Sequence, residues 1–79
     1  MLGKKRKEKE RRFREEAIPH MDTIFRGAFY LTKRESEAED LVQDTYLKAF
    51  KSFDSFKSGT NCKAWLYRIM TNTFLNSKR

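Results

Sequence analysis

The side chains of this chain that could do chemistry lie in its last third, where basic, aromatic and amide groups occur without an acid. Lysine and arginine can bind phosphates, and asparagine and threonine can hydrogen-bond to base edges. An aromatic ring on a basic loop, such as Phe56 between Ser55 and Lys57, can stack on an unpaired base, and we expect this ring to be partly exposed. Residues 55–79 contain no Asp or Glu, and their cations are Lys57, Lys63, Arg68, Lys78 and Arg79. This composition favours a nucleic-acid surface over a merely solvated basic face.

The preceding segment, residues 35–44, has the opposite charge and contains five acids. On a helix that turns about 100° per residue, Leu47 falls in the middle of its polar side. That side carries Glu37, Asp40, Gln43 and Asp44. Isolated exposed leucines are ordinary, but a leucine ringed by polar groups also has the form of an apolar anchor in a protein interface. The residues alone leave both interpretations open.

Nothing in the sequence indicates a catalytic or metal site. His20 is the only histidine and Cys62 the only cysteine, and they lie far apart in the sequence. No phosphate-binding glycine loop and no suitably placed carboxylate pair accompany them. We therefore expect no enzyme, no metal and no cofactor. Since one cysteine cannot form an intramolecular disulfide, we expect a cytoplasmic protein with Cys62 inert in the core.

The elements that must position these groups are expected to be helices. Helical periodicity covers nearly everything after residue 17, and strand signals are missing, so the sequence predicts an all-α, compact three-helix bundle. We expect three helices. The first covers residues 17–31, the second begins with a capping box formed by Ser36 and Glu39, and the third covers residues 62–76. Either Thr60 or Asn61 can N-cap the last helix. The expected core stripe of the first helix is Ile18, Met21, Phe25, Ala28 and Phe29.

The other two helices each have an expected core arc. In the second helix it is Ala38, Leu41, Val42, Thr45 and Ala49. In the third helix it is Cys62, Trp65, Leu66, Ile69, Met70 and Thr73.

Residues 1–16 form a separate basic arm ahead of a domain over residues 17–79. The arm holds eight basic and four acidic residues, and we expect either a frayed helix or a disordered segment. It could lie on nucleic acid or remain solvated. The net charge of +7 is consistent with a polyanionic partner, whereas no segment is apolar and long enough to insert into a membrane.

Several sequence segments resemble conserved region 2 of the extracytoplasmic-function sigma factors, which initiate bacterial transcription. The resemblance covers about residues 18–79. It rests on AEDLVQDTYLKAF at 38–50, FDSF at 53–56, GTN at 59–61 and AWLYRIMTNTFLN at 64–76. The GTN and TNTF wording is most similar to the oxidative- or envelope-stress branch. The family's helix-turn-helix for the minus-thirty-five element is not among these residues, so we expect a domain fragment that cannot direct initiation alone.

The resemblance implies two binding surfaces. The first docks on the clamp helices of the RNA polymerase β′ subunit, and its residues are Asp40, Gln43, Asp44 and Leu47. The second recognises and melts the promoter minus-ten element, with Phe56 and Asn72 lining a pocket for a flipped non-template base. Its residues are Lys48, Phe56, Lys57, Asn61, Lys63, Tyr67, Arg68, Thr71, Asn72 and Leu75. An anti-sigma protein that masks these surfaces is a further implied partner.

Two other functions are compatible with the residues. A helical module that inserts its last helix into the major groove would bind duplex better than single-stranded DNA. A protein adaptor would use only Leu47 and its acidic neighbours, and its basic helix would be solvated.

Overall fold

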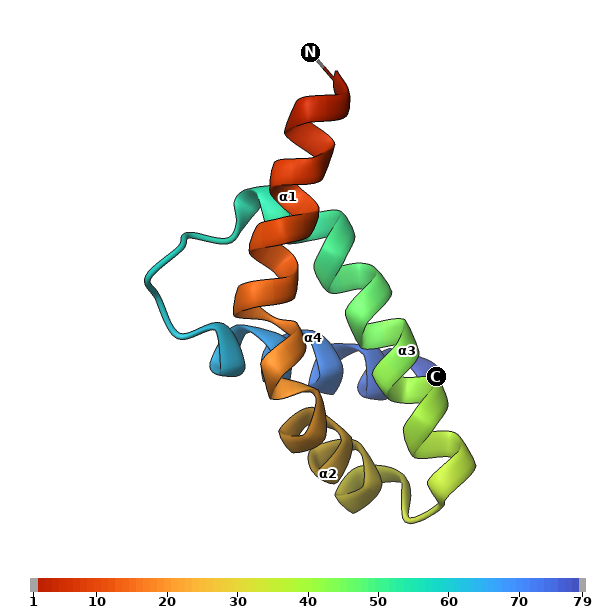
Figure 1. Ribbon diagram of the computed structural model, residues 1–79. Helices are drawn as coiled ribbons and strands as arrows, with labels where there is room; N and C mark the ends of the chain where they lie inside the picture. The colour runs from red at the N-terminus through yellow and green to blue at the C-terminus, as the bar shows by residue number, and fades with distance from the viewer. Residues whose placement is uncertain (1, 79) are drawn as a thin grey trace.

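The computed structural model describes residues 2–78, and every regular element in that range is helical (Figure 1). This confirms the all-α prediction. The elements in chain order are α1 Leu2–Glu16, a 3-10 turn η1 Ile18–His20, α2 Met21–Thr32, α3 Glu35–Ser52, a second 3-10 turn η2 Phe53–Ser55 and α4 Cys62–Ser77. None of these helices is both long and apolar enough to cross a bilayer.

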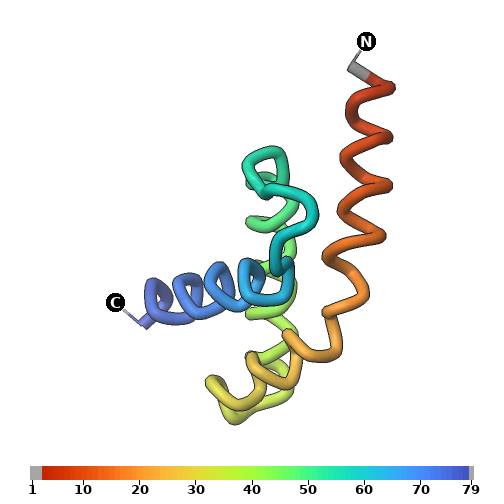
Figure 2. Tube along the Cα trace, turned by 90° about the vertical axis from the view of Figure 1, so that its left-hand side faces the viewer, coloured from red at the N-terminus to blue at the C-terminus, as the bar shows by residue number. Residues whose placement is uncertain are grey.

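Helices α2, α3 and α4 form the expected three-helix bundle. Helices α2 and α3 are joined by a short turn in which Lys33 adopts a left-handed conformation, with φ of 65°. Helix α4 packs on both and runs across them, as the two perpendicular views show (Figures 1 and 2). The ends of α3 and α4 are connected through η2 and an extended loop, residues 56–61, which we call the recognition loop.

Small and medium-sized side chains fill the centre of the bundle. Ile24, Thr45, Leu66 and Met70 are almost completely buried, together with several alanines that let the helices approach closely. The Thr45 hydroxyl donates a hydrogen bond of 2.7 Å to the carbonyl oxygen of Leu41, so it is buried without losing a partner. The expected core arcs of α3 and α4 are confirmed, except that Trp65 and Ile69 are only partly buried.

The expected core stripe of the first helix is wrong for three of its five residues, whereas Ala28 is buried and Phe25 packs against the core. Ile18, Met21 and Phe29 are 37%, 37% and 44% exposed, whereas the fully buried side chains are Ala17, Ile24 and Ala28. Residues 17–31 are also not one helix, because a 3-10 turn containing Pro19 precedes α2. This segment carries two apolar stripes, and periodicity alone cannot decide which of them faces α3 and α4.

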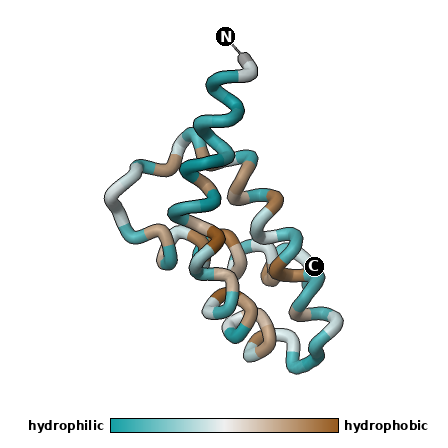
Figure 3. The backbone as a smooth tube through the Cα atoms, viewed as in Figure 1, coloured by the Kyte–Doolittle hydropathy of each residue, from teal (hydrophilic) through white to brown (hydrophobic). Residues whose placement is uncertain are grey.

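Helix α1 is a helix rather than a disordered arm, and its end packs on the bundle. The ring of Phe13 is buried and lies edge-on to the rings of Phe50 and Phe53, with centroid distances of 5.2 Å to each. The outer part of α1 is hydrophilic and extends away from the other helices (Figure 3). The division of the chain at residue 16 stays a prediction.

The predicted cap of α3 is wrong, and the cap of α4 is confirmed. Because Lys33 is left-handed and Arg34 extended, α3 begins at Glu35, which puts Ser36 inside the first turn without a capping bond. At α4, the Asn61 side-chain oxygen accepts a hydrogen bond of 3.0 Å from the Ala64 amide.

Candidate functional site

A hollow between α3 and α4 brings together two of the residues implicated in binding DNA, Lys48 and Asn72. It has a volume of about 340 Å³, and we call it the Asn72 hollow. Its lining residues are Lys48, Lys51, Ser52, Ile69, Asn72, Thr73 and Asn76. The Lys48 ammonium donates a hydrogen bond of 3.3 Å to the Thr73 hydroxyl, which holds its positive charge at the edge of the hollow. Cations, amides and hydroxyls without an acid suit a ligand that combines phosphate and base edges.

Tyr67 and Thr71 lie on the other flank of α4, away from the Asn72 hollow. They line a separate hollow of about 340 Å³ with Arg26, Gly27 and Tyr30. The Tyr67 hydroxyl donates a hydrogen bond of 3.3 Å to the carbonyl oxygen of Thr23. A side chain at position 27 would collide with the Tyr67 ring, since a Cβ there would lie 2.8 Å from it. Tyr67 therefore packs against α2 and lines a different hollow from Asn72, and its role in binding DNA stays a prediction.

The expectation that Phe56 is partly exposed is wrong. Its side chain is only 6% exposed. The ring stacks on Phe53 at a centroid distance of 5.5 Å and lies 4.8 Å from the ring of Trp65. Burying a large aromatic surface between η2 and α4 is more favourable than leaving it on the loop. The partly exposed aromatic side chain next to Phe56 is Trp65, which helical periodicity predicts to lie in the core.

The remaining side chains implicated in binding DNA are exposed, but not all of them are free to act. Lys57, Lys63 and Arg68 are exposed cations, and Leu75 is 57% exposed. The side-chain oxygen of Asn61 is already used as the helix cap, which leaves its amide NH₂ for a ligand.

A further hollow, between α3 and the segment formed by α1 and α2, is lined by Asp40, Gln43 and Leu47, three of the four residues that the resemblance assigns to the docking surface. Its volume is about 850 Å³, and we call it the Leu47 groove. The residues that line it are Phe13, Met21, Asp22, Phe25, Glu39, Asp40, Val42, Gln43, Tyr46, Leu47 and Phe50. Leu47 is 58% exposed, so it is an accessible apolar side chain with acids around it.

The lining of the groove also differs from the expected docking surface, which consists of Asp40, Gln43, Asp44 and Leu47. Asp44 does not line it but lies on the other edge of α3, in a smaller hollow with Thr73, Phe74 and Lys78. Met21 and Phe25 form part of the groove, although the sequence analysis assigned them to the core. The signal that could have identified them was the second apolar stripe of the first helix.

Two titratable groups are buried next to the bundle core. Burial raises the pKa of the Cys62 thiol, and the Glu16 carboxylate adds to this shift. Burial also raises the pKa of Tyr46, whose hydroxyl donates a hydrogen bond of 2.8 Å to the carbonyl oxygen of Ala17. Both groups are neutral near pH 7, so Cys62 is an unreactive core thiol as expected. Within residues 2–78 no cluster of histidine, cysteine and acid side chains could hold a metal ion.

Comparisons with known proteins identify the family of this chain. Residues 19–79 match the family model described as Sigma-70 region 2. The chain is 40% identical over 60 residues to the ECF RNA polymerase sigma factor SigE of Mycolicibacterium smegmatis, covering 76% of this chain and 23% of that protein. It is 35% identical over 66 residues to the ECF RNA polymerase sigma factor EcfG of Rhodopseudomonas palustris, covering 84% of this chain and 36% of that protein.

A third relative is the ECF RNA polymerase sigma factor SigW of Bacillus subtilis, which is 32% identical over 60 residues. That alignment covers 76% of this chain and 32% of the relative. The chain thus spans between 23% and 36% of the length of these three relatives. The chain belongs to the Sigma-70 region 2 family, a family of transcription initiation factors rather than of enzymes.

Proposed function

We propose that this chain docks on the clamp helices of the RNA polymerase β′ subunit and captures an unpaired, non-template base of the promoter minus-ten element. One observation supports this most directly. Leu47 stands exposed in an acid-rimmed groove on one flank of α3, while Lys48, the next residue, lines the acid-free Asn72 hollow on the other flank. A single helix thus separates a surface suited to a protein from a surface suited to a polyanion.

The docking half of the proposal rests on the chemistry of the Leu47 groove. Apolar side chains of Phe25, Val42 and Leu47 are combined with Asp40 and the amide of Gln43 at its edge. An apolar anchor inside a polar rim is typical of protein interfaces, and the acids select a partner with basic side chains at the corresponding positions. Asp44 would contribute from the adjacent edge of α3.

The DNA half rests on the Asn72 hollow and on exposed cations of α3, the recognition loop and α4. An asparagine amide offers both a donor and an acceptor to a base edge, and Lys48, Lys57, Lys63 and Arg68 can bind the flanking phosphates. Removing a base from its stack costs a few kcal/mol, which phosphate contacts and stacking can offset. Thr71, Tyr67 and Leu75 would contact the strand beyond the hollow.

The buried ring of Phe56 adds a condition to this proposal. Phe56 can stack on a base only if the recognition loop moves, because Phe53 and Trp65 cover its faces. In this structure the ring of Phe56 packs against the ring of Trp65. Trp65 lies two helical turns before Asn72 on the same side of α4. Base capture therefore includes either opening of the loop or stacking on Trp65.

The partners follow from the same surfaces. They are RNA polymerase core, single-stranded promoter DNA and an anti-sigma protein that covers one or both surfaces. The place of action is the cytoplasm, where the polymerase works.

Two exposed leucines allow both halves of the proposal to be tested with the same kind of substitution. Leu47 and Leu75 are 58% and 57% exposed, so neither Leu47→Asp nor Leu75→Asp should unfold the chain. We expect Leu47→Asp to abolish capture of the polymerase clamp helices and to leave affinity for single-stranded minus-ten DNA unchanged. Leu75→Asp should have the opposite effect, because it places a negative charge on the DNA face.

Binding is measured with a clamp-helix fragment on beads and with fluorescently labelled oligonucleotides. Unchanged clamp-helix capture by Leu47→Asp would remove the docking assignment. Tighter binding of wild type to duplex than to single-stranded minus-ten DNA would replace base capture by groove binding.

A further inference from the structure

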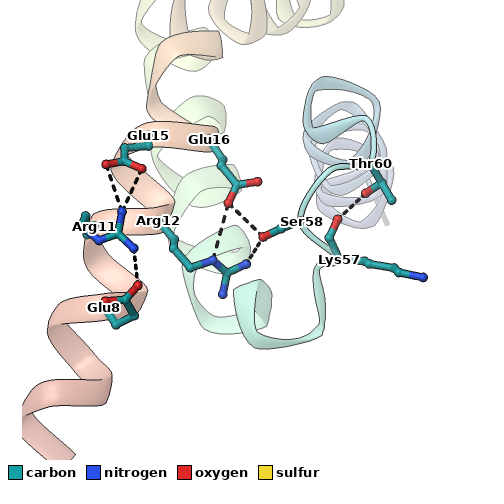
Figure 4. A network of polar contacts seen from close by, with 8 residues as sticks. All are labelled: Glu8, Arg11, Arg12, Glu15, Glu16, Lys57, Ser58 and Thr60. Carbon is teal, nitrogen blue, oxygen red and sulfur yellow. Dashed lines mark hydrogen bonds and ion pairs between the residues drawn. The ribbon is translucent and has the colours of Figure 1, made fainter.

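One face of α1 forms hydrogen bonds and an ion pair with the recognition loop and with η2, the 3-10 turn that precedes the loop. The Ser58 hydroxyl accepts a hydrogen bond from the Arg12 guanidinium and donates one of 3.0 Å to the Glu16 carboxylate (Figure 4). An ion pair of 3.6 Å between Arg12 and Glu16 closes the triangle. Among the described residues, these are the side-chain hydrogen bonds that tie residues 57–60 to another element.

Further contacts fix the same face of α1. The Lys9 ammonium forms an ion pair of 3.3 Å with Asp54 in η2 and lies 4.6 Å from the centre of the Phe50 ring. Arg12 lies 4.9 Å from the centre of the Phe53 ring. Positions 9, 12, 13 and 16 follow helical spacing, so one stripe of α1 makes all of these contacts.

The neighbouring stripe of α1 behaves differently. Among residues 2–78, Arg11 forms ion pairs only within the helix, with Glu8 and with Glu15, the latter at 3.1 Å (Figure 4). Glu15 and Glu16 are adjacent acids in the same last turn, yet only Glu16 contacts the loop. The chain therefore contains its own matched control for the contact.

Residues 57–60 of the loop, between the buried Phe56 and the capping Asn61, have little other support. Gly59 has φ of +90°, and the remaining described hydrogen bonds of these four residues are local, from the Thr60 hydroxyl and amide to the carbonyl oxygen of Lys57. Such a segment loses conformational entropy when it becomes ordered on a ligand. Contacts that order it beforehand remove part of that cost and tighten binding.

We propose that α1 is a positioning element for the recognition loop, in which Arg12 and Glu16 hold Ser58 and so preorganise the loop for single-stranded promoter DNA. The role of Arg12 and Glu16 in DNA binding rests on the proposed function of the loop. The contact to Ser58 itself does not, and the two can be measured separately.

The test uses the whole 79-residue chain in three variants, Glu16→Ala, Glu15→Ala and Ser58→Ala. Glu16→Ala and Glu15→Ala add the same net charge in the same turn, and each removes an ion pair with an arginine of α1, so their difference reports the contacts of Glu16 outside α1. We expect the NMR order parameters of the amides of residues 57–60 to fall below about 0.6 in Glu16→Ala and Ser58→Ala. Glu15→Ala should retain wild-type values. Affinity for single-stranded minus-ten DNA should fall roughly two- to tenfold relative to Glu15→Ala, the effect of about one hydrogen bond.

Ser58→Thr, which keeps the hydroxyl, should restore both values, and urea unfolding should show that all variants remain folded. Equal loop order parameters in Glu16→Ala and Glu15→Ala would show that the Glu16 contact does not hold the loop. A loosened loop with unchanged DNA affinity would overturn its positioning role. If wild type shows no preference for minus-ten DNA, the proposed function of the loop fails, and the order parameters still decide whether α1 holds it.

Discussion

Phe56 and Asn72 were paired by the resemblance, but their environments differ. Phe56 is enclosed by Phe53 and Trp65, whereas Asn72 is exposed at the edge of a hollow. A substitution at Phe56 therefore acts on the fold first, and a substitution at Asn72 acts on the surface. Loss of DNA binding in Phe56→Ala can be assigned to a lost base contact only when the stability of the same variant is also measured.

We predict that Phe56→Ala lowers the free energy of unfolding by about 3–5 kcal/mol, as removal of a buried aromatic ring does. Asn72→Ala should change it by less than about 0.5 kcal/mol, because the side chain is exposed. Urea denaturation checks both values, and oligonucleotide binding by Asn72→Ala should lose sequence preference. Wild-type stability of Phe56→Ala would mean that the ring is not packed as described.

Cys62 and Tyr46 give the stability a defined pH dependence. The pKa of each is raised in the folded state by burial, so the unfolded chain loses these protons first as the pH increases. Stability is therefore complete below the ordinary thiol pKa of about 8.5 and falls above it.

We predict that the urea midpoint decreases between pH 7.5 and about 9.5 in wild type and decreases less in Cys62→Ala, which removes the first of the two groups. Chemical denaturation at several pH values measures this. The same decrease in both proteins would contradict a raised pKa of Cys62.

At the scale of elements, two tasks are combined at Asn61, the residue that precedes α4. Asn61 ends the recognition loop and caps the helix, so loop conformation and helix stability are coupled through one side chain. Helix α3 instead lines two hollows, with Glu39, Asp40 and Leu47 at the Leu47 groove and Lys48 and Lys51 at the Asn72 hollow.

Two substitutions separate the tasks of Asn61. Asn61→Ala should lower stability by about 1 kcal/mol because the cap is lost. Asn61→Asp keeps a good capping residue and should retain stability, yet it should weaken DNA binding by placing a negative charge beside Lys57 and Lys63. Thermal unfolding and oligonucleotide titration measure the two effects, and DNA binding of Asn61→Asp at the wild-type level would remove Asn61 from the DNA surface.

For the whole molecule, the sorting of charge matters more than its sum. The net charge of +7 is carried by the DNA-facing segments and by α1, while Asp22, Glu39 and Asp40 line the Leu47 groove. Such separation orients a small domain between a protein and a nucleic acid, and it makes the DNA affinity sensitive to salt.

We predict that the affinity for single-stranded DNA falls with salt with a slope of log K against log salt of about −3, as for four phosphate contacts. Lys57→Gln should reduce the magnitude of this slope by about 0.7. Lys33→Gln, in the turn between α2 and α3, should leave it unchanged. A salt-independent affinity would favour the adaptor function, in which α4 is only solvated.

The sequence by itself determined the helical class, most of the inner faces of α3 and α4 and the family, and it reduced the cap of α4 to Thr60 or Asn61, because these features depend on residues close together in the chain. It also separated the two surfaces by charge. Only the tertiary structure decided that Phe56 is buried, that Tyr67 faces α2 rather than Asn72, and which stripe of α2 enters the core. It also placed α1 against the recognition loop through Arg12, Glu16 and Ser58. Those features depend on contacts between residues up to about 45 positions apart, which local periodicity does not encode.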